Sequence, residues 1–309
     1  PLPPPAEAAS LEVDGLSPLF TPNRDFYRID TALAAPRIEL DSWRLRVTGM
    51  VEQPLELSFD DLSALRQVEA DVTLACVSNE VGGELVGNAR WRGVPLAQLL
   101  EQAGVRPGAD QVVGRSVDGW TGGFPTAALD GGDALVALGM NGEPLPVVHG
   151  FPARLVVPGL YGYVSATKWL SEIELTTLEG FDGYWVPRGW SKLGPVKTQS
   201  RIDVPAAGAR LAPGRHAVAG VAWAPGRGVA RVEVSVDDGD WTEARLSEPL
   251  GAASWRQWRW AWDAEPGRHR LRVRATDGAG EVQTGRTAPP RPDGATGHHT
   301  IDVDVSESA

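Results

Sequence analysis

Hydrophobic and polar residues alternate over much of the sequence after residue 205, as Val232, Val234 and Val236 illustrate. This period of two is typical of strands with one buried face, and the turn Asp237–Asp240 predicts a hairpin. Five strands are predicted: Ala217–Trp223, Val229–Val236, Trp255–Trp262, His269–Ala275 and Thr300–Val305. About 100 residues of short strands separated by Gly, Pro and Asp turns predict an all-β, immunoglobulin-like sandwich.

Three tryptophans, Trp258, Trp260 and Trp262, recur at the same spacing and therefore share one face of a predicted strand. Indoles bury a large apolar area, so the core of a sheet or a subunit interface is favoured over a ligand platform.

Before residue 200 the pattern mixes strand and helix periods. Alternation predicts strands at Trp43–Val47 and Val72–Cys76. Two helices are predicted from their end signals: one after the Ser58/Asp61 capping box, and one over Leu96–Ala103 between Pro95 and Gly104.

A hairpin turn is predicted at Asn141-Gly142, between strands at Ala134–Met140 and Pro144–Val148. Further strands are predicted at Arg154–Pro158 and Lys168–Thr177. This half is therefore expected to be α+β, with helices interspersed among mixed strands.

A chain of 309 residues with 36 Gly and 25 Pro is too rich in turns for a helical bundle and long enough for two domains. We expect a Pro-rich tether at 1–19, the α+β domain at 20–204 and the sandwich at 205–309. The Pro-rich start has no initiator methionine. A removed signal peptide or membrane anchor would explain both facts and predicts an extracytoplasmic, membrane-tethered protein, although a truncated start explains the missing methionine equally well.

Charge and cysteine content exclude several function classes. Acidic residues outnumber basic ones by 40 to 29, a net charge of −11, so a nucleic acid is not expected as a partner. One cysteine excludes an intramolecular disulfide and a Cys-rich zinc or iron–sulfur site. The five histidines form no HExxH or haem-attachment pattern, and no apolar run reaches the roughly 18 residues of a membrane span.

The single cysteine, Cys76, ends an apolar strand and enters the polar loop Val77–Gly83. A thiol at a strand exit can face a cleft, although free cysteines are more often small buried hydrophobes. No His, Asn or Asp partner can be assigned by proximity, so a Cys–His hydrolase is not supported. A functional thiolate and an inert buried thiol are both open on these residues alone.

A second candidate site is the run His149–Trp169. His149 and Arg154 flank a buried-looking strand, and Lys168 follows a glycine-bearing loop with Ser and Thr. These groups could bind a phosphate and a polar heterocycle, but an ordinary strand–loop–strand has the same composition. No Walker A or dinucleotide-binding glycine pattern is present, so a nucleotide is a poor candidate.

Several motifs, taken in their order along the chain, resemble the sulfite oxidase family of molybdenum enzymes. They are Cys76 with Asn79, Met140–Pro146, His149–Arg154, Val156–Gly159 and Lys168-Trp169. The carboxyl-terminal third is similar to the immunoglobulin-like dimerisation domain of that family. The resemblance implies a homodimer with a Mo-molybdopterin cofactor, whose one molybdenum per chain is bound by the Cys76 thiolate.

The resemblance also implies which residues bind the phosphate-bearing pterin: Asn23, Phe26, Tyr27, Arg28, Ser116, His149, Arg154, Ser165, Thr167 and Lys168. The resemblance further implies that Arg28, Cys76 and Trp120 are the catalytic residues of the site. The implied reaction transfers an oxygen atom between the molybdenum centre and a small, sulfur-containing substrate. The electrons are expected to be exchanged with a separate haem protein or a haem-bearing membrane module.

Two departures from the family pattern bear on the substrate. Sulfite oxidases follow the cysteine motif with paired arginines where this chain has Glu80 and Val81, and Trp120 stands in place of a tyrosine. Such a site should bind the sulfite dianion poorly. A sulfoxide-reducing member of the family also lacks the arginine pair, so sulfite oxidation and sulfoxide or N-oxide reduction both stay open. The alternative from another class is a cofactor-free binding or structural protein in which Cys76 is merely buried.

Overall fold

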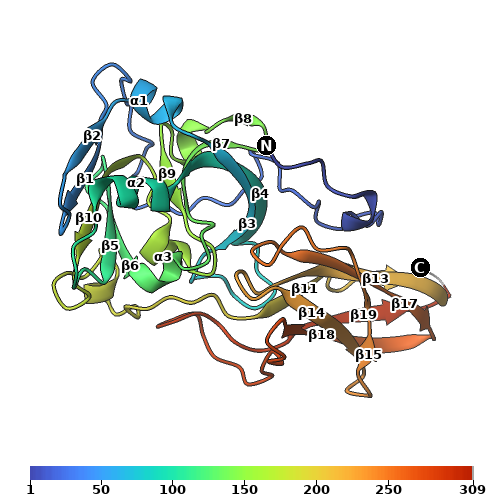
Figure 1. The fold of residues 1–309 in the computed structure, drawn as a ribbon. Helices are drawn as coiled ribbons and strands as arrows, with labels where there is room; N and C mark the ends of the chain where they lie inside the picture. Colours follow the sequence, from blue (N-terminus) through green and yellow to red (C-terminus); the bar gives the residue numbers. More distant parts are fainter. Residues whose placement is uncertain (308–309) are drawn as a thin grey trace.

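The computed structural model describes residues 1–307, and Figure 1 shows two sheet-rich parts that lie side by side. The first part contains every strand up to Thr176 and three short α-helices, and we call it the first domain. The second part contains every strand from Gln199 onward, and we call it the sandwich.

The first domain contains a mixed sheet in the order β2-β1-β10-β5-β6. Its strands are β1 (Leu45–Gly49), β2 (Leu55–Leu57), β5 (Gln111–Ser116), β6 (Thr121–Pro125) and β10 (Leu170–Thr176). β1 runs parallel to β10, and the other neighbours are antiparallel. Alternate residues such as Leu45, Val47 and Ile173 are fully buried, because the sheet faces a shared apolar core on one side.

A second sheet of the first domain has the order β3-β4-β7-β8, and β9 pairs with β7. Its strands are β3 (Val68–Ala75), β4 (Val86–Pro95), β7 (Leu135–Met140), β8 (Glu143–Pro144) and β9 (Arg154–Val156). β3 ends one residue before Cys76, whose amide donates to the carbonyl of Leu85 at 2.9 Å. The strand therefore delivers Cys76 directly into the loop that joins β3 to β4.

Helices are few and short. The α-helices are α1 (Phe59–Ala64), α2 (Leu96–Ala103) and α3 (Gly162–Ser165), and the 3-10 helices are η1 (Glu7–Ala9), η2 (Thr126–Leu129), η3 (Val147–His149) and η4 (Val186–Arg188). The Ser58/Asp61 capping box is confirmed at α1, and Gly104 ends α2 with a φ of 69°. Within residues 1–307 no helix has both the length and the apolar content needed to cross a membrane.

The region after the Asn141-Gly142 turn differs from the prediction. Both turn residues have positive φ, as a tight hairpin requires, so the turn itself is confirmed. The predicted strand Pro144–Val148 is wrong, because pairing stops at Pro144 and η3 follows. Proline has no amide hydrogen for a sheet ladder, and a second proline, Pro146, caps η3.

The sandwich consists of two sheets packed around one apolar core. One sheet has the order β11-β13-β17-β16, with β11 (Gln199–Val204), β13 (Gly214–Trp223), β16 (Arg245–Leu246) and β17 (Arg256–Ala264). The other has the order β12-β19-β18-β14-β15, with β12 (Arg210–Leu211), β14 (Val229–Val236), β15 (Thr242–Glu243), β18 (Gly267–Asp277) and β19 (His299–Val305). The five predicted strands are all present.

Two details of the sandwich correct or sharpen the predictions. β11 pairs with β13, so the sandwich begins at Gln199 and not at 205. The sequence of β11 shows no clear alternation of apolar and polar residues, because Ile202 is the one large apolar residue that this strand contributes to the core. Trp258 and Trp262 are 0% and 5% exposed, and Trp260 packs partly buried against the same core, so the core interpretation of these indoles is confirmed.

Residues 1–19 are not a free spacer in this structure. The Leu11 amide donates to Gln257 Oε1 at 2.6 Å, and the Glu248 amide donates to the carbonyl of Ala8 at 2.9 Å. Arg90 of the first domain donates to the carbonyl of Pro3 at 2.8 Å. The segment therefore lies against both parts of the molecule, although its prolines alone would favour an extended tether.

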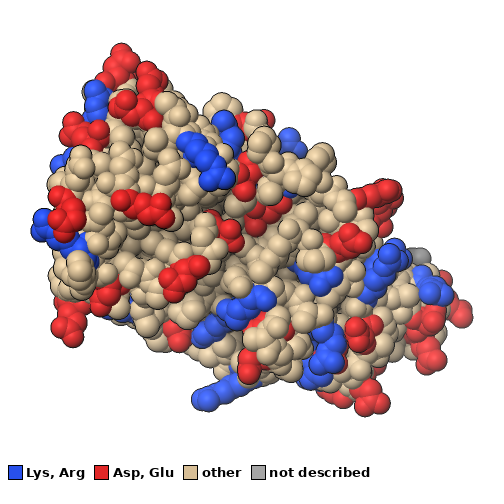
Figure 2. Space-filling view, viewed as in Figure 1, with Lys and Arg blue, Asp and Glu red and all other residues tan. Residues whose placement is uncertain are grey.

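Charges of both signs are interspersed over the surface. Figure 2 shows acidic side chains scattered over the whole visible face, with Lys and Arg lying between them. This distribution agrees with the net charge of −11, which leaves no large positive field on this face.

Candidate cofactor and metal site

A pocket of about 920 Å³, its open mouth included, lies in the first domain beside the end of β3. Eight of the twelve predicted site residues line it: Phe26, Tyr27, Cys76, Ser116, Trp120, His149, Arg154 and Lys168. They come from the loop before β1, the β3–β4 and β5–β6 loops, the residues around β9, and the segment after α3. The fold therefore brings together residues that are up to 142 positions apart, from Phe26 to Lys168.

The other four predicted residues do not line the pocket, although each contacts a residue that does or is next to one in the sequence. The backbone carbonyl of Asn23 accepts a hydrogen bond from the His149 ring, and the Ser165 hydroxyl donates to the carbonyl of Tyr161 at 3.0 Å. The Thr167 hydroxyl is buried and has no hydrogen-bond partner among residues 1–307. Arg28 is half-exposed, and its guanidinium lies 3.4 Å from the carboxylate of Asp30.

Cys76 is 7% exposed and faces the pocket from the end of β3. Burial raises the pKa of the Cys76 thiol, and hydrogen bonds from the Ser78 amide and hydroxyl oppose that shift. A bound cation would replace the thiol proton and reverse the effect of burial, because a thiolate is the form that binds metals. Burial thus favours the protonated thiol until a metal binds it.

Tyr27 places a phenol close to the same end of the pocket. Its ring stacks on Phe26 with centroids 5.4 Å apart. A methyl group added to Gly162 would lie 3.7 Å from Tyr27 Oη and 4.0 Å from the carbonyl oxygen of Ala75, so the phenol lies near the strand end that carries Cys76. No hydrogen bond joins Tyr27 Oη to any residue from 1 to 307, and burial raises the pKa of this phenol. The phenol is therefore a free donor facing the pocket.

His149 is 2% exposed and closes one wall. Its Nε2 lies 2.6 Å from the carbonyl oxygen of Asn23, so Nε2 carries the proton and donates, which leaves Nδ1 as an acceptor. Burial, together with the nearby cations Arg154 and Lys168, lowers the pKa of His149 to about 4 against the opposing hydrogen bond to Asn23, so the imidazole is neutral at pH 7.

Arg154 is a buried cation without an acidic partner. It is 5% exposed, its Nη1 donates to the carbonyl of His149 at 3.0 Å, and its guanidinium lies 4.9 Å from the centre of the Trp91 ring. No carboxylate among residues 1–307 lies within ion-pair distance of it. Burial lowers its pKa to about 10, so the side chain stays charged at pH 7. Asp30 acts on Arg154 only from beyond ion-pair distance, and a buried charge without a direct counter-ion is costly, which points to an anionic ligand.

Lys168 is the second cation of the pocket, and it forms an ion pair with Asp30. Its ammonium also donates to the carbonyl of Val148 at 3.0 Å and lies 4.9 Å from the centre of the Trp169 ring. Burial lowers the pKa of Lys168 to about 8, and the contact with Asp30 opposes that shift. Asp30 thus bridges Lys168 and the more exposed Arg28.

Sequence reasoning missed several residues that line the pocket, notably Asp30, Tyr163, Trp185 and Trp190. Tyr163 and Trp190 have ring centroids 6.0 Å apart, and Tyr163 Oη donates to the carbonyl of Ser191 at 2.5 Å. The density of aromatic residues from Tyr184 to Trp190 was an available signal. Nothing in the sequence shows that this segment, which follows the last strand of the first domain, returns to the pocket.

The structure also changes the argument about Glu80 and Val81. Neither residue lines the pocket, and Glu80 is exposed. The loop that carries them turns toward the sandwich after Cys76, with Gly83 contacting Arg201. The predicted effect of Glu80 and Val81 on substrate charge is therefore not supported by their position, whereas Trp120 does line the pocket.

These groups fit a phosphate-bearing pterin with a thiolate-bound metal. The buried charge of Arg154, which lines the pocket, calls for an anionic group in the ligand. Among residues 1–307 no three His, Cys, Asp or Glu side chains gather as a metal site, so Cys76 would be the metal's single protein ligand. A soft thiolate suits a metal that is otherwise bound by dithiolene sulfur. The pocket is that of a protein that binds an organic metal cofactor.

Comparison with known proteins places the chain within this class. Residues 32–185 match the family described as oxidoreductase molybdopterin binding domain, and residues 195–286 match the Mo-co oxidoreductase dimerisation domain. Rat mitochondrial sulfite oxidase is 32% identical over 319 residues, which cover 87% of this chain and 58% of the relative. Chicken sulfite oxidase is 30% identical, with 87% of this chain and 69% of the relative covered.

The fold is also similar to a crystal structure, that of the sulfane dehydrogenase SoxCD from Paracoccus pantotrophus. The TM-score is 0.81 at 26% sequence identity, and the match covers 96% of this chain and 83% of that chain. The chain spans 58% of the length of the rat enzyme. It belongs to the sulfite oxidase family of molybdopterin-dependent oxidoreductases, whose cofactor is Mo-molybdopterin. The predicted family and cofactor are confirmed.

Proposed function

We propose that the protein transfers an oxygen atom between its molybdenum cofactor and a small sulfur compound of low charge, and exchanges the electrons with a separate redox protein. The observation that carries this proposal is the convergence of Cys76, Arg154 and Lys168 in one pocket. When bound, the cofactor supplies a two-electron redox centre for oxygen-atom transfer. The named relatives, sulfite oxidases and a sulfane dehydrogenase, support a sulfur compound as substrate.

The residues of the chain have separate tasks in this proposal. Arg154 and Lys168 would bind the phosphate of the cofactor, and Cys76 would bind the metal. Neutral His149 would hold a polar edge of the pterin through Nδ1, because its Nε2 is committed to Asn23. The Tyr27 phenol would donate a hydrogen bond at the end of the pocket next to Cys76. Its proton is held in place, since burial raises the phenol pKa.

The aromatic wall supports a substrate of low charge. Trp120, Trp185 and Trp190 line the pocket, and Asp30 already neutralises Lys168. A dianion such as sulfite needs charge-assisted hydrogen bonds that indoles do not supply. Apolar walls instead favour a neutral sulfur group with small alkyl substituents.

A second candidate within the same chemistry is the reduction of a neutral sulfoxide. The same indole wall favours it, because a sulfoxide has an apolar body and one oxygen acceptor for the Tyr27 phenol. The two directions are separated by assaying sulfite with ferricyanide and dimethyl sulfoxide with reduced methyl viologen. We expect kcat/KM for the neutral compound to exceed that for sulfite at least about tenfold. Efficient sulfite turnover would refute the low-charge proposal.

The role of Cys76 is tested by metal analysis. Wild-type protein from a host that makes the cofactor is expected to contain about one molybdenum per chain, and Cys76→Ser is expected to lose most of it, because a hydroxyl is a poor ligand for a soft site. Ser235→Ala, in the sandwich, is the control and should retain the metal. Metal-free wild-type protein from such a host would favour a cofactor-free binding protein instead.

The remaining proposals concern assembly and location. The match to a dimerisation domain supports a homodimer, in which the sandwich would act as an immunoglobulin-like pairing module. A haem protein or a haem-bearing membrane module is the proposed electron partner. An extracytoplasmic location stays a prediction, and fractionation of cells that express the full gene tests it.

A further inference from the structure

Cys76 lies between two places at which its own segment is held by the sandwich. The first is Thr73, three residues before the cysteine on β3. The Thr73 amide donates to the carbonyl of Ala253 at 3.0 Å, and the Trp255 amide donates to Thr73 Oγ1 at 2.7 Å. Two backbone groups of the sandwich thus hold one residue of the strand that delivers Cys76.

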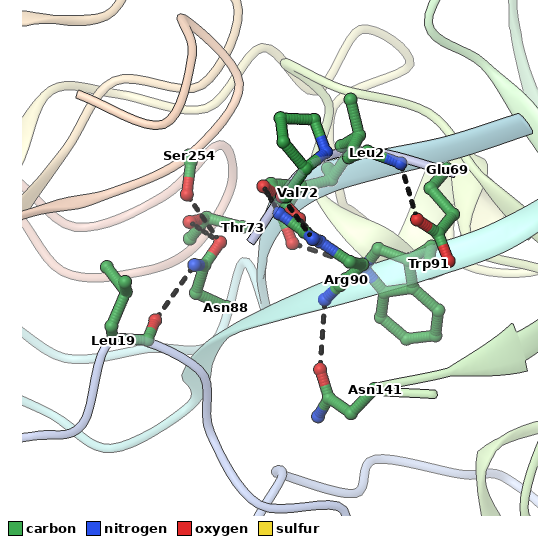
Figure 3. Close-up of polar contacts among 12 residues, drawn as sticks. Leu2, Leu19, Glu69, Val72, Thr73, Asn88, Arg90, Trp91, Asn141 and Ser254 are labelled. Atoms are coloured by element: carbon green, nitrogen blue, oxygen red, sulfur yellow. Dashed lines mark hydrogen bonds and ion pairs between the residues drawn. The ribbon is translucent and has the colours of Figure 1, made fainter. Parts of the chain in front are cut away.

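This first attachment is part of a buried polar network, shown in Figure 3. Thr73 Oγ1 and Ser254 Oγ both donate to Asn88 Oδ1, at 3.0 and 2.8 Å, and Asn88 Nδ2 donates to the carbonyl of Leu19 at 2.9 Å. Thr73, Asn88 and Ser254 are each at most 1% exposed. A buried network whose members are all paired specifies one arrangement, because any displacement leaves a polar atom unsatisfied.

The second attachment lies after the cysteine, at Gly82 and Gly83. Arg201 of β11 donates to the carbonyl of Gly83 at 2.9 Å, and its guanidinium is also paired with Asp203 at 2.6 Å. Gly82, at a φ of 79°, packs on His299 so closely that an added methyl group would lie 2.2 Å from His299 Cδ2. The imidazole is fixed in turn, since its Nδ1 accepts from the Ile202 amide at 2.9 Å.

Hydrogen bonds within the loop between these attachments also restrict its conformation. Its base is closed by the hydrogen bond from the Cys76 amide to Leu85, and the Leu85 amide donates to Asn79 Oδ1 at 2.9 Å. We propose that the sandwich positions the Cys76 thiol. It does so by holding Thr73 on one side of the cysteine and the Gly82–Gly83 turn on the other. The proposal rests on the proposed role of Cys76 as that ligand. It gives the sandwich a part in the metal site as well as in pairing.

The first test follows the thiol itself and needs no metal. Because Cys76 is the single cysteine, the rate at which the cofactor-free 309-residue chain reacts with iodoacetamide reports how closely the loop confines this thiol. Thr73→Val keeps the shape but removes both hydroxyl contacts, and we expect it to react about tenfold faster. Thr73→Ser should restore the slow rate.

A matched control separates positioning from general loss of stability. Ser235→Ala removes an equally buried hydroxyl, which donates to the carbonyl of Gly239 at 2.8 Å in a distant hairpin. It should lower the melting temperature without changing the labelling rate. Equal acceleration in both variants, or none in Thr73→Val, would show that the sandwich does not hold Cys76. If Thr73→Val does not fold, Arg201→Gln at the second attachment is tested instead, and it too should be labelled about tenfold faster than the wild type.

The second test uses the molybdenum-loaded enzyme. In Thr73→Val we expect the visible absorption band of the thiolate–molybdenum bond to shift or broaden and kcat to fall about tenfold, with KM little changed. Ser235→Ala should keep the wild-type band. An unchanged band and kcat in a loaded Thr73→Val enzyme contradict the proposal. Absence of molybdenum from the wild-type protein instead contradicts the proposed function, and the labelling test still decides whether the loop is held.

Discussion

At the scale of single residues, burial in the same pocket has opposite consequences for His149 and Arg154. Burial disfavours the charged form of both, but it brings the pKa of His149 to about 4 and that of Arg154 only to about 10. At pH 7 the imidazole is therefore neutral and the guanidinium charged. The pocket thus presents one fixed positive charge beside a neutral donor–acceptor ring, which suits a phosphate next to a heterocycle.

His149 should make folding stability pH-dependent in a defined window. Its folded-state pKa is lowered, so between about pH 6.5 and 4 the unfolded chain binds the extra proton and stability falls as pH falls. We expect His149→Gln to lose less stability than the wild type between pH 7.5 and 5, as measured by urea unfolding. Identical pH dependence in the wild type and His149→Gln would show that this histidine does not titrate as argued.

Tyr27 offers a second test at this scale. Tyr27→Phe removes a hydroxyl that has no partner within the described chain, so we expect molybdenum content and melting temperature to be nearly unchanged. If the phenol contacts the substrate, kcat/KM should fall about tenfold, the value of one good hydrogen bond. Tyr163→Phe, which loses its bond to Ser191, should instead cost stability. Full activity in Tyr27→Phe would remove the phenol from the proposed site.

At the scale of elements, the β7–β8 hairpin is a fixed support for the pocket. Asn141 adopts a φ of 52° in its turn, and its Nδ2 donates to the carbonyl of Thr21 and to Asn23 Oδ1, both at 2.9 Å. Its Oδ1 accepts from the Arg90 amide at 2.9 Å. The turn therefore holds the loop whose Asn23 carbonyl orients His149.

Substitution at this turn separates its two contributions. Asn141→Ala removes the three side-chain hydrogen bonds, and alanine adopts a positive φ less readily than asparagine. We therefore expect the free energy of unfolding to fall by about 2–4 kcal/mol. Asn141→Gly relieves the φ penalty and should recover about 1 kcal/mol of that loss. Urea unfolding of both variants measures the difference. Equal stability of the two would mean that the turn conformation contributes nothing.

At the scale of the whole molecule, the two parts are joined by more than the connecting chain. The Asn88 network, the Arg201 contact and residues 1–19 all cross from the first domain to the sandwich. The sandwich, for which we propose a role in pairing, therefore also contacts the segments on both sides of Cys76.

The oligomeric state is predicted directly from this arrangement. Light scattering after gel filtration should give about twice the chain mass of 33.0 kDa, because the matched dimerisation domain lies in the sandwich. Trp258 and Trp262 are used in the sandwich core, so the pairing surface must lie elsewhere. A mass of one chain that does not change with concentration would contradict the proposed homodimer.

Much of the local structure could be predicted from the sequence. Alternation placed the sandwich strands, and the Asn141-Gly142 and Asp237-Asp238 turns have the positive φ values that their residue types tolerate. The errors have local causes: Pro144 ended a strand that its neighbours favoured, and β11 has too few apolar residues to be recognised. Cys76, His149, Arg154 and Lys168 could be singled out because each stands in a short contiguous motif, and the structure places all four around one pocket.

The remaining features depend on contacts between distant segments. The sequence by itself determined which side chains can bind a soft metal or a phosphate, because a thiol, a guanidinium and an ammonium have these binding properties in any fold. Only the tertiary structure decided how those groups are paired. Asp30 pairs with Lys168, whereas among residues 1–307 Arg154 has backbone carbonyl partners but no carboxylate at ion-pair distance. It also decided that the sandwich holds Cys76, since hydrogen bonds between residues almost 200 positions apart leave no periodic signal in the chain.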